Sequence, residues 1–173
     1  ETLAKKPRAD GRGDGTIVMI NGAPTDNNAK LFKQGAHSVI DESDLKVGKE
    51  YDTPDWSPDK AQQEMEQPTT APAKGGFAGV YAANDGTAGG AIAAMKSAGI
   101  DPKTRPTTGQ DAELAGIQRI LTGEQYMTVY KAIKEEAEAA AELAVALVRG
   151  EDPPSGLVGD EGDNGQKQVA SIL

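Results

Sequence analysis

Segments that favour β-strands alternate five times with segments of helical periodicity along this chain of 173 residues. The expected strands are 16–20, 45–51, 77–83, 104–108 and 126–130. Apolar or alanine-rich helical patterns follow them at 29–40, 59–67, 88–99, 114–121 and 135–148. The first strand, Thr16-Ile-Val-Met-Ile20, is a continuous apolar run of the kind that is buried on both faces of a parallel sheet. The alternation predicts an α/β fold with a doubly wound parallel sheet.

Polar residues suited to capping precede several of these helices. Thr25 or Asn27 can cap the first helix, with Asp26 near its positive end. Ser57 followed by Pro58 is typical of an N-cap and a first helical residue. Asp85 is interpreted as the cap of the helix that follows the third strand.

Composition and charge exclude several classes of function. The net charge of -9 argues against a nucleic-acid partner, and no apolar stretch approaches the length of a membrane span. The chain has no cysteine for a disulfide or a thiolate, and its one histidine, His37, cannot make a histidine-based metal site or a Ser-His-Asp triad. Residues 160–165 resemble a calcium loop but lack its ligand spacing, and they are expected to form a solvated loop. No catalytic residue, metal or cofactor is therefore expected.

Polar groups cluster where the predicted strands end. In an open parallel sheet the carboxyl ends of the strands line one edge, and ligands bind in the crevice there. The segments at these ends are 21–28, 51–56, 82–85, 108–111 and 128–131. Their amides, carboxylates, ammonium group and indole describe a binding pocket for a polyhydroxyl ligand rather than a reaction centre.

Two residues in these segments have competing interpretations. Trp56, the single tryptophan, is either a loop anchor or a platform for the C–H face of a pyranose, and the second role is favoured. Asn84 is either a helix cap or a ligand contact, and its two donors and one acceptor in one plane suit vicinal hydroxyls. The glycines at 86–90 fit neither of the usual phosphate-binding fingerprints.

Asp111 and Lys131 close consecutive predicted strands and can lie on the same edge. They form either an ordinary ion pair or a pair of sugar contacts, and a charged hydrogen bond of the second kind contributes about 1.5–3 kcal/mol. Acid–base catalysis is disfavoured, because no second carboxylate, histidine or hydroxyl nucleophile stands at a comparable position.

Four segments in this order resemble the D-xylose-binding proteins, which are solute receptors of bacterial sugar ABC importers within the ribose/galactose-binding group. The segments are Pro24-Thr-Asp-Asn-Asn-Ala-Lys-Leu-Phe32, Ala82-Ala-Asn-Asp-Gly-Thr-Ala-Gly-Gly-Ala-Ile92, Gly109-Gln-Asp-Ala-Glu-Leu-Ala-Gly-Ile117 and Met127-Thr-Val-Tyr-Lys131. The resemblance implies a two-lobed receptor that closes on one monosaccharide, most simply D-xylose. It implies sugar contacts at Asn28, Trp56, Asn84, Asp111 and Lys131. It implies supporting roles for Asp26, Asn27, Asp85 and Gln110.

The resemblance also implies how the chain is organised. Residues 1–131 are expected to be the C-terminal sugar-binding lobe without its first strand, beginning in the tail of a helix at 1–6. Residues 132–173 are expected to be a crossover helix and tail that pack on a missing N-terminal lobe. The helix face with Ala140, Ala144 and Leu147 would then be exposed and could mediate self-association.

The expected partner of the intact protein is an ABC permease, and the expected location is extracytoplasmic, either in the periplasm or on the cell surface as a lipoprotein. The alternative is the effector-binding domain of a sugar-responsive transcription regulator, which has the same fold.

Overall fold

The computed structural model describes residues 15–70, 76–154, 158–163 and 168–172, and it describes side chains for the first two ranges. The expected helix tail at 1–6 lies outside the described residues. The chain divides into two units, Glu1–Tyr130 and Lys131–Leu173. The first unit carries the parallel sheet, and the second carries one long helix and a hairpin.

The sheet of the first unit has three regular strands. They are β1 (Thr16–Asn21), β2 (Lys46–Asp52) and β3 (Phe77–Ala82), which pair in parallel in the order β2-β1-β3. Each lies within one residue of a predicted strand, so these three predictions are confirmed. The strand between the other two, β1, is the continuous apolar run, which is the pattern expected for a strand covered on both faces.

The two later strand predictions, 104–108 and 126–130, are wrong as regular strands. Each segment forms a single parallel bridge instead, Val80 with Thr107 and Gln110 with Val129. The first segment begins inside a 3-10 turn, η2 (Pro102–Thr104). Pro106 has no N–H to donate to a ladder, which limits how far a regular strand can extend there. The sheet therefore continues past β3 as irregular segments that keep the parallel direction.

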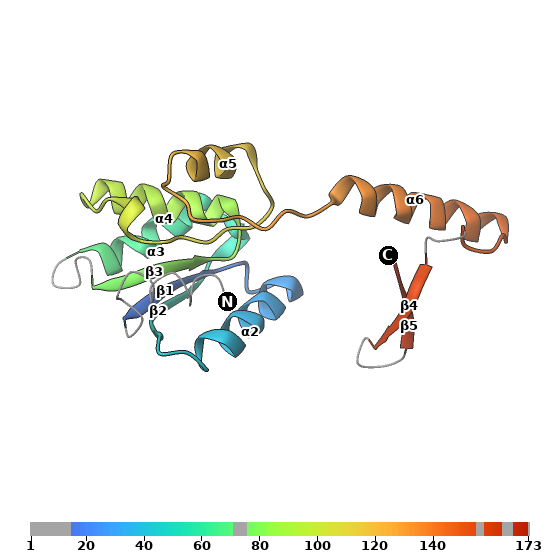
Figure 1. The fold of residues 1–173 in the computed structure, drawn as a ribbon, viewed down its shortest axis with the longest axis horizontal. Coiled ribbons are helices and arrows are strands. Elements are labelled where there is room, and N and C mark those ends of the chain that lie inside the picture. The colour runs from blue at the N-terminus through green and yellow to red at the C-terminus, as the bar shows by residue number, and fades with distance from the viewer. Residues whose placement is uncertain (1–14, 71–75, 155–157, 164–167, 173) are drawn as a thin grey trace. The chain divides into compact units, whose positions relative to one another are not determined.

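Helices cover both faces of the sheet (Figure 1). One face carries α2 (Asn27–Ile40), and the other carries α3 (Pro58–Thr69) and α4 (Asp85–Ser97). The side chains of β1 alternate between the two cores: Val18 and Ile20 pack in the α3/α4 core, whereas Ile17 and Met19 pack in the α2 core. The expected doubly wound α/β architecture is confirmed.

The helix starts follow the capping chemistry but not every predicted residue. Asp26, rather than Thr25 or Asn27, caps α2, because its Oδ1 accepts from the backbone N–H of Asn28 at 2.8 Å. The prediction for α3 is confirmed, since the Ser57 hydroxyl caps the helix and Pro58 is its first residue. A short helix, α5 (Leu114–Leu121), occupies the predicted range.

The second unit contains α6 (Ile133–Arg149), close to the predicted helix 135–148. Gly150 ends it in the left-handed conformation with φ 70°. An antiparallel hairpin follows, formed by β4 (Val158–Asp163) and β5 (Gln168–Ile172). The loop predicted at 160–165 is wrong for residues 160–163, which belong to β4, and 164–165 lie outside the described residues.

Candidate functional site

The predicted contacts of the first unit lie on connections that leave one edge of the sheet. Asn28 is the second residue of α2 after β1, and Trp56 ends the turn η1 (Pro54–Trp56) after β2. Asn84 follows β3, and Asp111 follows the bridge made by Gln110. Because the strands run in parallel, these four connections all start from the carboxyl edge, where open α/β sheets bind ligands. That they touch a sugar remains a prediction.

Asp26 links two of these predicted contacts. Its Oδ1 accepts from the Asn28 backbone N–H at 2.8 Å, and its Oδ2 accepts from the indole N–H of Trp56 at 3.2 Å. The Asn28 side chain is exposed, as is that of Asn27, while Trp56 is half-buried. The predicted supporting role of Asp26 thus has a geometric basis, because one carboxylate orients the indole and caps the helix that carries Asn28.

The indole of Trp56 lies against the backbone of Gly22, where a Cβ atom would overlap the ring. Trp56 and its neighbour Asp55 both have left-handed backbones, with φ values of 55° and 59°. This conformation is rare for a bulky residue such as tryptophan. It persists only where the surroundings enforce it, and such places concentrate at functional sites.

The roles assigned to Asn84 and Asp85 need a correction, because Asn84 and not Asp85 is the cap of α4. The Asn84 Oδ1 accepts from the backbone N–H of Thr87 at 2.8 Å, and the Thr87 hydroxyl lies 3.3 Å from the Asn84 backbone N–H in a capping box. Asn84 remains half-exposed at the edge, so capping occupies its carbonyl oxygen while its amide N–H₂ can still donate.

Asp85 is instead fully buried, and its carboxylate is an internal acceptor. Gln125 donates to its Oδ1 at 2.7 Å, whereas the Glu113 N–H and the Thr128 hydroxyl each donate to its Oδ2 at 2.9 Å. A buried carboxylate requires such partners, since an unpaired charge away from water is costly. Asp85 therefore supports the edge from inside.

The backbone at Asp111 is the second strained place on this edge. Asp111 and Ala112 have φ values of 100° and 50°. The Asp111 N–H donates to the carbonyl of Val129 at 2.9 Å, and the Gln110 carbonyl accepts from the Asp85 N–H at 2.8 Å. Gln110, a predicted supporting residue, thus contacts α4 through its backbone, which anchors the segment that presents Asp111.

Lys131 is the fifth predicted contact, and it is the first residue of the second unit. It is half-buried. Its role as a sugar contact remains a prediction.

A charged cluster between α2 and β2 was not foreseen from the sequence. The Lys33 ammonium lies 2.6 Å from Glu50 Oε1 and 3.1 Å from Asp52 Oδ1. His37 is half-buried, and its Nε2 lies 3.2 Å from Glu50 Oε2. The amide of Asn21 donates to both carboxylates at 3.1 Å. A signal existed, since Lys33 and His37 are four residues apart on a helix and Glu50 and Asp52 are two apart on a strand.

The charged cluster shifts the pKa values of two of its members, Glu50 and Lys33. Burial alone would raise the pKa of Glu50, but hydrogen bonds from Lys33 and Asn21 and the Lys33 charge outweigh burial and hold that pKa below its ordinary value of 4.5. The hydrogen bond to Glu50 raises the pKa of Lys33 above 10.5. Both groups are therefore held in their charged forms near neutral pH.

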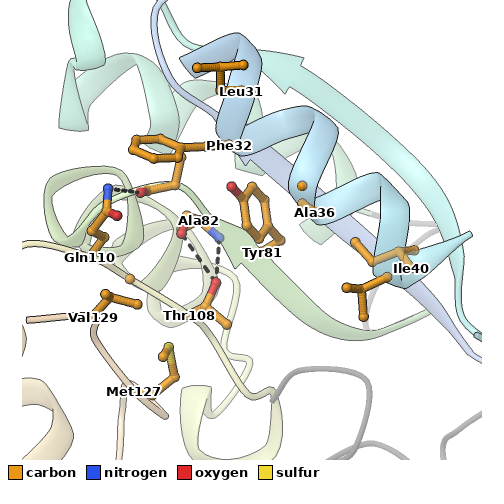
Figure 2. Close-up of a pocket in the computed structure, with 14 residues that line it drawn as sticks. Leu31, Phe32, Ala36, Ile40, Tyr81, Ala82, Thr108, Gln110, Met127 and Val129 are labelled. Atoms are coloured by element: carbon orange, nitrogen blue, oxygen red, sulfur yellow. Dashed lines mark hydrogen bonds between the residues drawn. The ribbon is translucent and has the colours of Figure 1, made fainter. Parts of the chain in front are cut away.

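A groove of about 420 Å³ on the α2 face does not coincide with the predicted sugar contacts. Figure 2 shows Phe32, Ala36 and Ile40 of α2 on one side and Thr108, Met127 and Val129 on the other. Gln110 and the half-buried Tyr81 also line it, and burial raises the pKa of Tyr81 to about 12. The lining is mainly apolar and offers few hydrogen-bonding side chains to sugar hydroxyls, and none of the five predicted contacts belongs to it.

The described residues contain neither a metal-binding cluster nor a membrane-spanning helix. Residues 15–70 and 76–154 bring together no group of three or more histidine, cysteine, aspartate or glutamate side chains that could hold a metal ion. Within the described part of the chain, no helix combines the length and the apolar character needed to cross a bilayer.

Comparison with known proteins places the fold in a class. The model of the periplasmic binding protein domain matches residues 1–152, and the chain belongs to this family. A solute-binding protein of an ABC transporter from Clostridium phytofermentans, solved with bound β-D-glucose, superposes with a TM-score of 0.76 at 25% identity. That superposition covers 99% of this chain and 58% of the other.

Curated relatives narrow the comparison. The D-xylose-binding periplasmic protein of Haemophilus influenzae is 42% identical over 164 residues, covering 92% of this chain and 48% of the relative. The protein of the same name from Escherichia coli is 41% identical over 175 residues, covering 99% and 52%. The resemblance seen in the sequence is confirmed. This chain spans about half the length of these relatives, and neither of them is described as a transcription regulator.

Proposed function

We propose that this chain is the sugar-binding lobe of an extracytoplasmic solute-binding protein that serves ABC-type import, with D-xylose as its ligand. The observation that carries the proposal is the agreement between the relatives, which are named for D-xylose and are 41–42% identical, and the polar residues on the carboxyl edge. Residues 1–131 would form the C-terminal lobe, and residues 132–173 would pack on a further lobe.

The proposed chemistry is binding without reaction. Asn28 and Asn84 offer amide donors, and Asp111 accepts from sugar hydroxyls while Lys131 donates to them. Trp56 offers an apolar face to the pyranose ring. Each hydrogen bond and the stacking contact orient one neutral sugar, and a second lobe that closes over it would exclude water. No bond is made or broken in this scheme, so the protein would not be an enzyme.

Calorimetry on the full-length protein with D-xylose, D-glucose and D-ribose tests this function. We expect D-xylose to bind most tightly of the three. Absence of heat with all three sugars would refute the sugar-receptor role, and tighter binding of glucose or ribose would reassign the ligand.

The chain alone is expected to bind far more weakly than the full-length protein, because a second lobe would supply further contacts and shield the site from water. Micromolar or tighter binding of D-xylose by residues 1–173 alone would show that a second lobe is dispensable.

Two further parts of the proposal concern partners and location. The partner is an ABC permease, and the location is the periplasm or, with a lipid anchor, the cell surface. The residues Ala140, Ala144 and Leu147 of α6 are exposed in this chain, as required for a face that meets another lobe. Sedimentation velocity at rising concentration tests whether the chain self-associates, and Leu147→Glu should abolish that association if α6 mediates it.

A further inference from the structure

The left-handed turn at Asp111 and Ala112 is hydrogen-bonded to the buried carboxylate of Asp85, directly and through Thr128. The N–H of Glu113 donates to Asp85 Oδ2 directly, at 2.9 Å. The N–H of Ala112 reaches the same oxygen through Thr128, because it donates to the Thr128 hydroxyl at 3.1 Å and that hydroxyl donates to Asp85 Oδ2 at 2.9 Å. Two consecutive backbone N–H groups thus depend on one carboxylate oxygen.

The other carboxylate oxygen of Asp85, Oδ1, and its backbone carbonyl also have hydrogen-bond partners. Gln125 donates to Oδ1 at 2.7 Å, and the side-chain amide oxygen of Gln125, Oε1, accepts from Arg119 Nε at 2.9 Å. Arg119 also donates to the backbone carbonyl of Asp85 at 2.6 Å. A Cβ atom at Gly109 or Gly116 would overlap the carboxylate. These contacts restrict the movement of the Asp85 carboxylate, so its position relative to the turn is fixed.

These hydrogen bonds matter because the backbone of the turn is strained. Asp111 and Ala112 have φ values of 100° and 50°, a backbone region that is unfavourable for non-glycine residues and persists only where the surrounding structure enforces it. Thr128 and Asp85 accept hydrogen bonds from the N–H groups of Ala112 and Glu113, and the Val129 carbonyl accepts from the N–H of Asp111. Together these bonds hold the backbone of the turn. Without them the turn can relax, and relaxation changes the direction in which Asp111 leaves the chain.

We propose that Thr128 and Asp85 are positioning residues that fix the direction of the Asp111 side chain for its contact with a sugar hydroxyl. This inference rests on the proposed function of Asp111 as a sugar contact. Thr128 is the more informative of the two, since it is half-buried and its hydroxyl relays one hydrogen bond without contributing a charge. It would act on sugar affinity only through Asp111.

The test uses the full-length protein with Thr128→Val, which removes the hydroxyl at nearly constant volume, and Thr128→Ser, which keeps it. Calorimetry with D-xylose should give a dissociation constant about tenfold higher for the valine variant and within about twofold of wild type for the serine variant, a tenfold change corresponding to about 1.4 kcal/mol. An unchanged dissociation constant in Thr128→Val overturns the inference.

A double-mutant cycle with Asp111→Asn separates positioning from general damage. If Thr128 acts through Asp111, Thr128→Val should change the affinity of the Asp111→Asn protein by less than about twofold. An equal loss in both backgrounds overturns the inference. If the wild-type protein binds no sugar at all, the proposed function itself fails, and that outcome is distinct because the variants then have no baseline.

A second readout does not depend on sugar. Hydrogen exchange at the amides of Ala112 and Glu113 should become faster in Thr128→Val and stay slow in Thr128→Ser. If both amides stay equally protected in the valine variant, Thr128 does not hold the turn, and the inference is wrong irrespective of any binding result.

Discussion

The indole N–H of Trp56 donates to Oδ2 of Asp26 at 3.2 Å, thirty positions away in the sequence. The second oxygen of the same carboxylate caps α2 at the N–H of Asn28. Two connections that follow different strands are therefore coupled by one side chain. The coupling makes Asp26 the residue through which the orientation of Trp56 can be tested.

Asp26→Ala should reduce both stability and sugar affinity. Loss of the N-cap costs about 1 kcal/mol, measurable by urea unfolding of the chain. The freed indole should also weaken D-xylose binding by the full-length protein. Asp26→Asn is the matched control, because its amide oxygen can still cap α2 but its N–H₂ group cannot accept from the indole at the same time. Stability should recover in Asp26→Asn while affinity stays low, and full recovery of both would show that the indole hydrogen bond is irrelevant.

Gly22→Ala should displace Trp56, because the added Cβ would overlap the indole ring. Trp56 is the single tryptophan, so its fluorescence reports the displacement without interference, and we expect a red-shifted emission maximum. Gly35→Ala in α2 is the control, since its Cβ meets no atom within 4 Å and a helical glycine-to-alanine change stabilises by about 0.5–1 kcal/mol. An unchanged spectrum in Gly22→Ala would contradict the close packing of ring and backbone.

Asn84 combines a cap with a proposed ligand contact, and two substitutions separate them. Asn84→Asp keeps an oxygen for the Thr87 N–H but removes both amide donors, so stability should be retained while D-xylose affinity falls. Asn84→Ala should lose both, with about 1 kcal/mol of destabilisation from the missing cap. Normal sugar affinity in Asn84→Asp would mean that Asn84 serves the helix alone.

The fold was predictable from the sequence where burial leaves a clear apolar pattern, as in the continuous apolar run of β1 and the helical periodicity of α6. The regular strand expected at 104–108 is wrong, because this polar, proline-containing segment joins the sheet through an isolated bridge between Thr107 and Val80. The sequence pattern indicated that the sheet continues beyond β3, but it could not show how regular the hydrogen bonding of the added segments would be.

The site was predictable to the level of segments rather than atoms. Adjacent residues such as Asn84 and Asp85 have the same local capping preference, so only tertiary partners decide between them. Those partners, Glu113 and Thr128, lie 28 and 43 positions beyond Asp85 and no local rule points to them. The charged cluster around Lys33 was missed for a related reason: its helix and strand spacings each look like ordinary solvated faces until the two elements are brought together.

The cluster around Glu50 predicts an acid-sensitive contribution to stability. The folded-state pKa of Glu50 lies below 4.5, so the unfolded chain takes up the proton first and acid favours unfolding. The contribution should be fully present above pH 4.5 and decline as the pH falls through the folded-state pKa. Urea unfolding of wild type and Glu50→Gln should therefore differ at pH 7 and converge at acid pH. Glu66→Gln, at an exposed position, is the control, and a Glu50→Gln difference independent of pH would contradict the pairing with Lys33.

The four left-handed residues Asp55, Trp56, Asp111 and Ala112 set this edge apart from the remainder of the described chain, where positive φ values fall on glycines. Glycine at these four positions would relieve torsional strain but would also make the loops more flexible. A stabilised version of this protein, obtained by selection for thermal tolerance alone, would therefore be expected to accumulate changes here and to lose ligand binding as it did so. At this sheet edge, substitutions that raise thermal stability are therefore expected to weaken ligand binding.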